Sequence, residues 1–104
     1  MIDNSNIKIC FDVDGTLIEQ DPRSENVPRY EIIQLFQILR SLGCDMYIWS
    51  GDGVDYAARW AEKLGLKAKI VPKGSFKPDI AVDDLYDQTL RKSENSLGDV
   101  NIQV

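Results

Sequence analysis

The chain has 104 residues, and its 12 Lys and Arg against 17 Asp and Glu give a formal net charge of −5, with no histidine. Residues 1–104 are long enough for one compact domain, and 43% hydrophobic residues are enough to fill its core. Because there is no imidazole, Ser-His-Asp and Cys-His nucleophile pairs, His-ligated zinc and phosphohistidine transfer are excluded.

The excess of negative charge argues against strong nucleic-acid binding, because that mode of binding needs a basic face. No apolar run approaches the roughly 20 residues of a membrane span. The polar opening at residues 3–6 is unlike a secretory signal. We therefore expect a cytoplasmic protein with no membrane partner.

The two cysteines, Cys10 and Cys44, lie inside apolar runs, which indicates reduced and buried thiols. A thiol phosphatase needs an arginine six residues after its cysteine to hold the phosphate. The residues at that spacing are Thr16 and Ser50, so cysteine catalysis is not expected.

The first half of the chain predicts a strand and a helix. Residues 7–11 form a short apolar run that ends in a polar turn, which indicates a buried strand. Residues 19–28 are polar and contain two prolines. Apolar side chains then recur at helical spacing from Tyr30 to Leu42, and Gly43 is suited to end that helix.

The second half continues the alternation. Residues 44–49 predict a second buried strand, and residues 54–64 predict a helix that ends at Gly65. Further short strands are expected at 66–71, 80–82 and 101–104. Strands that alternate with helices predict an α/β fold with a mostly parallel five-stranded sheet.

Polar side chains follow the predicted strands at the points where they end. They are Asp12 and Asp14 after the first strand, Ser50 after the second, Lys73 after the third, and Asp83 and Asp84 after the fourth. In an open parallel sheet these strand ends meet at the edge where ligands bind. Four carboxylates at one edge repel one another unless some are protonated or a cation lies among them, and Mg²⁺ suits oxygen ligands combined with phosphate.

These residue types also fit phosphoryl transfer. A phosphoryl group held by magnesium, Lys73 and the Ser50 hydroxyl would leave an in-line approach open for a carboxylate nucleophile. An Asp-x-Asp-Gly sequence also opens calcium-binding EF-hand loops. That interpretation fails because the glycine comes fourth rather than sixth and the twelfth position is Arg23.

Four motifs therefore stand in a fixed order, and they are DVDGT at 12–16, Ser50, a lysine, and IAVDD at 80–84. Together they resemble the four motifs of the haloacid dehalogenase (HAD) superfamily, and the resemblance spans residues 7–84. It implies a three-layer Rossmann-like HAD fold. It also implies a phosphatase, because the second aspartate of the first motif is typical of phosphoryl transfer rather than dehalogenation.

The resemblance also implies roles for these residues. Asp12 would be the nucleophile that becomes an aspartyl-phosphate, and Asp14 would protonate the leaving group and then activate water. Ser50 and the backbone N–H of Gly51 would bind phosphate oxygens. Magnesium would be held by the Asp12 carboxylate, by the Asp14 carbonyl and by one aspartate of the Asp83–Asp84 pair.

Two choices within this set need an argument. Of Asp83 and Asp84, we favour Asp83 as the direct metal ligand, and the reverse stays open. Lys77 would lie near the start of the fourth strand, roughly 13 Å from Asp83, whereas Lys73 follows the third strand at the correct edge. The spacing of ten residues from Lys73 to Asp83 also resembles the deoxyribonucleotidase branch of the superfamily. We therefore choose Lys73.

Most small-molecule phosphatases of this superfamily carry a cap domain, and this chain has no room for one. We therefore expect an open site that takes a phosphorylated substrate, large or macromolecular, or that borrows a lid from another subunit of an oligomer. Three alternatives to a phosphatase remain, which are a phosphotransferase, a polynucleotide-end phosphatase, and a metal- and phosphate-binding module without turnover.

Overall fold

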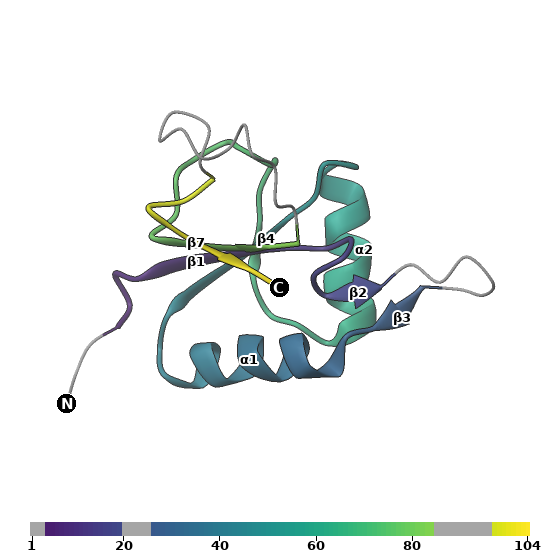
Figure 1. Ribbon diagram of the computed structural model, residues 1–104, viewed down its shortest axis with the longest axis horizontal. Coiled ribbons are helices and arrows are strands. Elements are labelled where there is room, and N and C mark those ends of the chain that lie inside the picture. The colour runs from purple at the N-terminus through teal and green to yellow at the C-terminus, as the bar shows by residue number, and fades with distance from the viewer. Residues whose placement is uncertain (1–3, 20–25, 85–96) are drawn as a thin grey trace.

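Five parallel strands form the sheet at the centre of the computed structural model, which describes residues 4–19, 26–84 and 97–104 (Figure 1). The strands are β1 (Lys8–Asp12), β4 (Asp45–Trp49), β5 (Lys69–Ile70), β6 (Ile80–Asp83) and β7 (Val100–Gln103), in the spatial order β5-β4-β1-β6-β7. The helices are α1 (Tyr30–Ser41) and α2 (Val54–Leu64). The predicted Rossmann-like α/β class is confirmed, and the sheet is parallel throughout.

Strand β1 lies at the middle of the sheet, between β4 and β6. Its Ile9 faces Met46 of β4 on one side and Ile80 of β6 on the other. Residues 9–12 of the strand are all buried, because neighbours cover both of its edges and both of its faces. A fully buried strand is expected to read as a continuous apolar run, and this explains its sequence.

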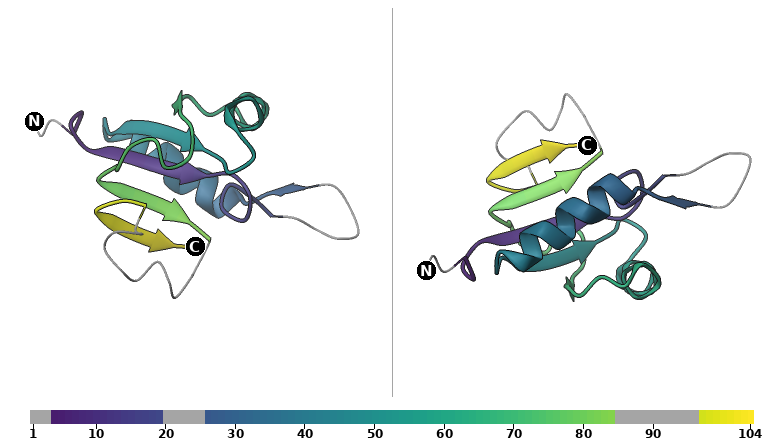
Figure 2. Two further views of the ribbon diagram at one scale, coloured as in Figure 1. Left: turned by 90° about the horizontal axis from the view of Figure 1, so that it is seen from above. Right: turned by 90° about the horizontal axis from the view of Figure 1, so that it is seen from below.

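Both described helices pack against the same face of the sheet. On this face Ile32 and Phe36 of α1 and Ala57 and Ala61 of α2 join one apolar cluster with alternate residues of the strands. Figure 2 shows α1 lying over the strands when the molecule is seen from below. The rings of Phe11 and Phe36 meet edge to face, with 5.2 Å between their centroids. This face therefore holds the larger part of the core.

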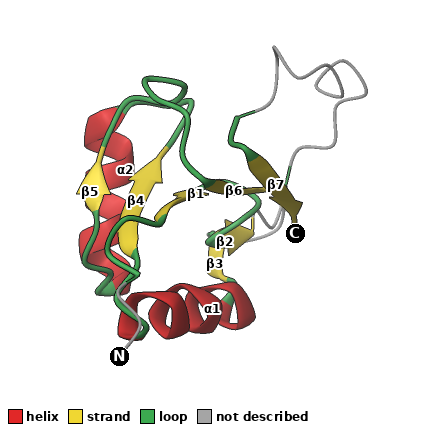
Figure 3. Ribbon diagram, turned by 90° about the vertical axis from the view of Figure 1, so that its left-hand side faces the viewer, coloured by secondary structure: helices red, strands yellow, loops and turns green. Residues whose placement is uncertain are grey.

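The opposite face of the sheet is covered by loop residues in the described ranges. Cys10, Tyr47 and Trp49 are buried there beneath Phe76 and Leu97. The loop from β5 to β6 carries Phe76 and lies on the side of the sheet away from α1 (Figures 1 and 3). The ring of Phe76 is 4.7 Å from Tyr47 and 5.9 Å from Trp49 between centroids. The aromatic contacts fix the path of this loop.

The helix boundaries match the sequence patterns closely. Helix α2 spans the predicted residues, and Gly65 ends it in the left-handed conformation with φ 70°. Helix α1 ends at Ser41, followed by Gly43 with φ 89°. Neither helix in the described ranges has the length and apolar character needed to cross a membrane.

Two segments differ from the sequence prediction. The third strand is shorter than 66–71, because the N–H of Leu66 bonds the Ala61 carbonyl and so belongs to the end of α2. A two-stranded antiparallel ribbon, β2 (Ile18–Glu19) with β3 (Val27–Pro28), was not predicted in the polar stretch 19–28. Residues 20–25 of that stretch, and Arg23 with them, lie outside the described residues.

Short elements separate the predicted motifs. Only the β2–β3 ribbon and α1 are described between the first motif and β4, and only α2 between β4 and β5. No cap domain is therefore present in the part of the chain that the structure describes.

Candidate active site

The carboxyl ends of the strands bring the predicted polar residues to one edge of the sheet. Asp12 is the last residue of β1, Asp83 is the last residue of β6, and Ser50 directly follows β4. All three residues are buried, with whole-residue exposed fractions of 5%, 6% and 3%. These residues lie together because β1, β4 and β6 are parallel neighbours, so their carboxyl ends share one edge of the sheet.

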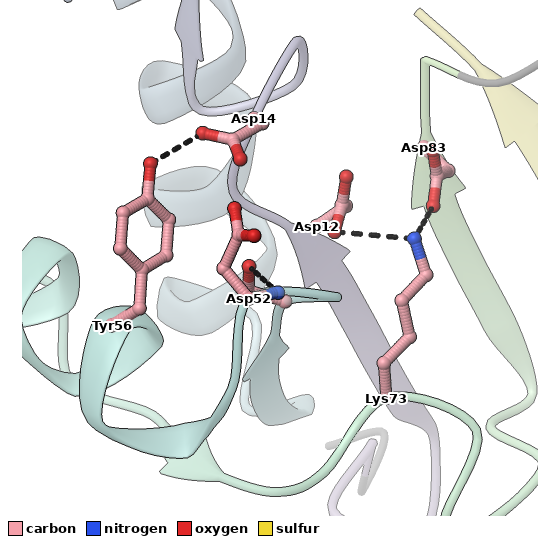
Figure 4. A network of polar contacts seen from close by, with 7 residues as sticks. Asp12, Asp14, Asp52, Tyr56, Lys73 and Asp83 are labelled. Atoms are coloured by element: carbon pink, nitrogen blue, oxygen red, sulfur yellow. Dashed lines mark hydrogen bonds and ion pairs between the residues drawn. The ribbon is translucent and has the colours of Figure 1, made fainter.

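Lys73 joins the two strand ends. It lies in the loop after β5, and its Nζ is 3.4 Å from Asp12 Oδ1 and 3.0 Å from Asp83 Oδ2 (Figure 4). Lys77, the alternative lysine, pairs with a different aspartate, and its Nζ is 3.8 Å from Asp99 Oδ1. The structure thus brings Lys73, rather than Lys77, to the carboxylates.

Asp12, Asp83 and Asp84 form a group that suits a metal ion. Each offers one carboxylate oxygen, and these oxygens all lie within 4.8 Å of one another. Hard oxygen donors of this kind fit Mg²⁺. Both Asp83 and Asp84 belong to the group, so the choice of direct ligand stays open. The Asp14 carboxylate does not belong to it, and the role predicted for the Asp14 carbonyl stays a prediction.

Gly15 makes room for Asp84, one of these three carboxylates. Its backbone has φ 77°, and a Cβ atom built on it would overlap the carboxylate of Asp84. Any other residue would have to displace Asp84 in addition to accepting a strained backbone. The glycine of the first motif therefore sets the position of an aspartate of the last motif.

The carboxylates of this edge carry more negative charge than Lys73 balances. Burial raises the pKa of Asp12 from 3.8 to about 7, with a further rise from the charge of Asp83 and an opposing effect of Lys73. Burial also raises the pKa of Asp84, and a hydrogen bond with Asp83 adds to this rise. A divalent cation at this point would offset the repulsion and favour the ionised carboxylates.

Lys73 remains charged in this setting. Burial tends to lower its pKa, but attraction to Asp12 and the hydrogen bond to Asp83 outweigh burial, and the net result is a raised pKa. A fixed positive charge beside Asp12 can attract an anionic phosphoryl group.

Asp14 points away from Asp12 and toward α2 (Figure 4). The hydroxyl of Tyr56 donates a hydrogen bond of 2.6 Å to Asp14 Oδ1. Burial raises the pKa of Asp14, the Tyr56 hydrogen bond opposes the rise, and the carboxyl of Asp52 adds to it. A raised pKa helps a carboxyl group to hold and release a proton near neutral pH.

Ser50 shapes the turn that leads into α2. Its Oγ accepts a hydrogen bond of 3.0 Å from the backbone N–H of Asp52, and its carbonyl accepts one of 3.1 Å from the N–H of Gly53. Gly51 is exposed at the same turn. The predicted phosphate-binding pair therefore lies at the strand end next to Asp12, since Asp12 faces Trp49 across the sheet.

Sequence reasoning missed Tyr56 and Arg29. The one available signal for Tyr56 was its place in the first turn of the helix after Ser50, where a long side chain can reach the neighbouring strand end. Arg29 Nη1 donates a hydrogen bond of 2.6 Å to the Gly15 carbonyl, and its backbone N–H bonds the Leu17 carbonyl. Arg29 thus holds the loop of the first motif, through a contact that no local pattern indicates.

Comparisons of the whole chain with protein families, with curated protein sequences and with solved structures give no match. A function is therefore inferred from the site residues and from the order of their motifs.

Proposed function

We propose that this protein is a magnesium-dependent phosphomonoester hydrolase of the HAD type, which works through an aspartyl-phosphate on Asp12. The observation that carries the proposal is the position of Lys73, whose Nζ contacts both Asp12 and Asp83 at the carboxyl ends of two neighbouring strands. A buried carboxylate beside a fixed ammonium group and a set of metal-type oxygens is suited to attack on a phosphoryl group.

The first half of the reaction would use four side chains and one backbone N–H group. Lys73 Nζ and the Ser50 hydroxyl, with the N–H of Gly51, would bind the phosphoryl oxygens. A carboxylate oxygen of Asp12 would attack phosphorus as the bond to the leaving oxygen breaks, and Asp14 would give its proton to that oxygen. Asp12, Asp83 and Asp84 would hold Mg²⁺, which would neutralise phosphoryl charge when bound.

The second half would return the residues to their starting state. Asp14, now ionised, would take a proton from a water molecule as the water oxygen attacks phosphorus. The bond between phosphorus and the Asp12 oxygen would break, so inorganic phosphate leaves and both aspartates are restored. The raised pKa of Asp14 supports this acid–base role.

The proposal extends to the substrate class and the setting. Because no cap is described over the sheet edge, an open site suits a large or macromolecular phosphorylated substrate, and a lid from a second subunit is an alternative. A cytoplasmic location, inferred from the sequence alone, remains part of the proposal.

Phosphate release from 4-nitrophenyl phosphate tests the chemistry, with and without magnesium. We expect release by the wild type to require Mg²⁺ and the Asp12→Asn variant to lose more than about 1,000-fold in kcat. Asp99→Asn is the matched control, because Asp99 is exposed and pairs only loosely with Lys77 at 3.8 Å. Circular dichroism checks that each variant is folded.

Beryllofluoride, a mimic of an aspartate-bound phosphoryl group, provides a second arm. We expect it to bind the wild type with Mg²⁺ and not to bind Asp12→Asn, as measured by calorimetry. Full activity in Asp12→Asn would contradict the proposal. Absence of both phosphate release and beryllofluoride binding in the wild type would favour a module without turnover.

A further inference from the structure

Tyr56 connects the proposed proton donor, Asp14, to the helix that follows the phosphate-binding turn. It belongs to the first turn of α2, and its hydroxyl donates to Asp14 Oδ1 at 2.6 Å. Its ring is half-buried and packs against the main apolar cluster. Because the ring is held on one side by the core, the hydroxyl presents a fixed hydrogen-bond donor to the carboxylate.

Asp14 needs such a partner. It lies after the end of β1 in a tight loop, where the next residue, Gly15, has φ 77°. Its side chain points away from the Asp12, Asp83 and Lys73 group (Figure 4). A group that transfers protons must be held within hydrogen-bond reach of the reacting oxygen, and a misplacement of about 1 Å can cost about 100-fold in rate.

We propose that Tyr56 is a positioning residue that fixes the rotamer of the Asp14 carboxyl and, through it, controls proton exchange with the leaving oxygen and then with water. This inference rests on the proposed function. The turn at Ser50 and the helix that follows it would then align both the phosphoryl group and the proton donor. Ser50 directly precedes the turn into α2, and Tyr56 lies within α2. Movement of α2 relative to β1 would affect the phosphoryl group and the proton donor together.

Two aryl esters separate a positioning role from a structural role. Phenyl phosphate has a basic leaving group that depends on protonation, whereas 4-nitrophenyl phosphate has a leaving group that departs with little help. In Tyr56→Phe we expect kcat/KM to fall by about 10-fold or more for phenyl phosphate. The fall for 4-nitrophenyl phosphate should be several times smaller.

Tyr30→Phe is the matched control, because Tyr30 begins α1 and is 71% exposed. It should behave as the wild type on both esters. An equal loss on both esters in Tyr56→Phe, or no loss on either, would overturn the positioning role.

A double-mutant cycle asks whether Tyr56 acts through Asp14. In an Asp14→Asn background, Tyr56→Phe should cause no further fall in kcat/KM, because the group it positions no longer transfers a proton. If the double variant instead shows the product of the two single fold losses in kcat/KM, Tyr56 does not act through Asp14, and the inference is overturned. If the wild type hydrolyses neither ester, the proposed function fails and this inference fails with it. If the wild type is active, the cycle decides on Tyr56 alone.

Discussion

Lys73 and Lys77 lie on one loop, yet they meet aspartates in different surroundings. The Lys73 side chain is 22% exposed and contacts Asp83, whose side chain is 8% exposed, at 3.0 Å. Lys77 and Asp99 are 51% and 64% exposed and are 3.8 Å apart. Exposed ion pairs contribute little because water screens them, whereas breaking a buried pair leaves an unpaired charge with a large desolvation cost. Burial, rather than residue type, separates the two lysines.

Replacement of each lysine by methionine gives the largest expected difference. Lys73→Met should lower phosphate release from 4-nitrophenyl phosphate by about 100- to 1,000-fold, because it removes a fixed charge at the proposed phosphoryl position. Lys77→Met should stay within about twofold of the wild type, because its partner is exposed and screened. Equal activities in the two variants, measured at saturating Mg²⁺, would mean that the position of Lys73 has no catalytic meaning.

Glycine replacement compares the metal group with a distant turn. Gly15→Ala and Gly43→Ala both place a side chain on a left-handed backbone, which costs about 1–2 kcal/mol of stability in each case. Only Gly15→Ala also displaces Asp84, and we expect it to raise the Mg²⁺ concentration for half-maximal activity by about 10-fold.

Thermal unfolding and magnesium titration of the two glycine variants measure these effects side by side. Equal magnesium requirements in both variants would show that the position of Asp84 does not affect the metal. A normal magnesium requirement in Gly43→Ala, together with a raised one in Gly15→Ala, would show that Gly15 affects metal binding through the position of Asp84.

Stability without divalent cations should depend on pH through Asp12. Its pKa in the folded protein is about 7, above the usual 3.8, so the folded state binds more protons than the unfolded state between these values. The contribution of Asp12 is therefore fully present below about pH 4 and is lost as the pH rises through 7. We expect a loss on the order of 1 kcal/mol or more.

Urea unfolding in a chelating buffer at pH 5 and pH 7.5 measures this slope. Asp12→Asn should flatten it, and the matched variant Asp99→Asn should keep it, because Asp12 is then intact. Added Mg²⁺ should restore stability at pH 7.5, since the metal favours the ionised carboxylate. A slope that Asp12→Asn leaves unchanged would assign it to other groups.

The sequence predicts most of the elements because their signals are local. Apolar runs of strand length and glycines such as Gly43 and Gly65 determine where strands and helices end. The sheet then places Asp12, Asp83 and Ser50 together, since parallel strands share one carboxyl edge. No comparable local signal exists for the β2–β3 ribbon, which pairs only two residues on each side.

Contacts that depend on packing were beyond the reach of the sequence. The Tyr56 bond to Asp14 and the Arg29 bond to Gly15 join segments whose relative positions follow from the whole core. The path of the Lys73 loop similarly depends on Phe76, which rests on the rings of Tyr47 and Trp49. The positions of the strand ends in the sequence were enough to predict which residues meet. The orientation of their side chains depends on packing, which the sequence pattern does not reveal.

The central place of β1 has a consequence for synthesis of the chain. Asp12 is made early, but its neighbours Lys73 and Asp83 come from a loop and a strand that are made much later, and β6 pairs directly with β1. A nascent chain that ends before β6 therefore carries Asp12 without Asp83, the carboxylate to which Lys73 joins it. The ribosome must release β6 before the three carboxylates can gather, so the charge cluster at this edge forms only after most of the chain has been made.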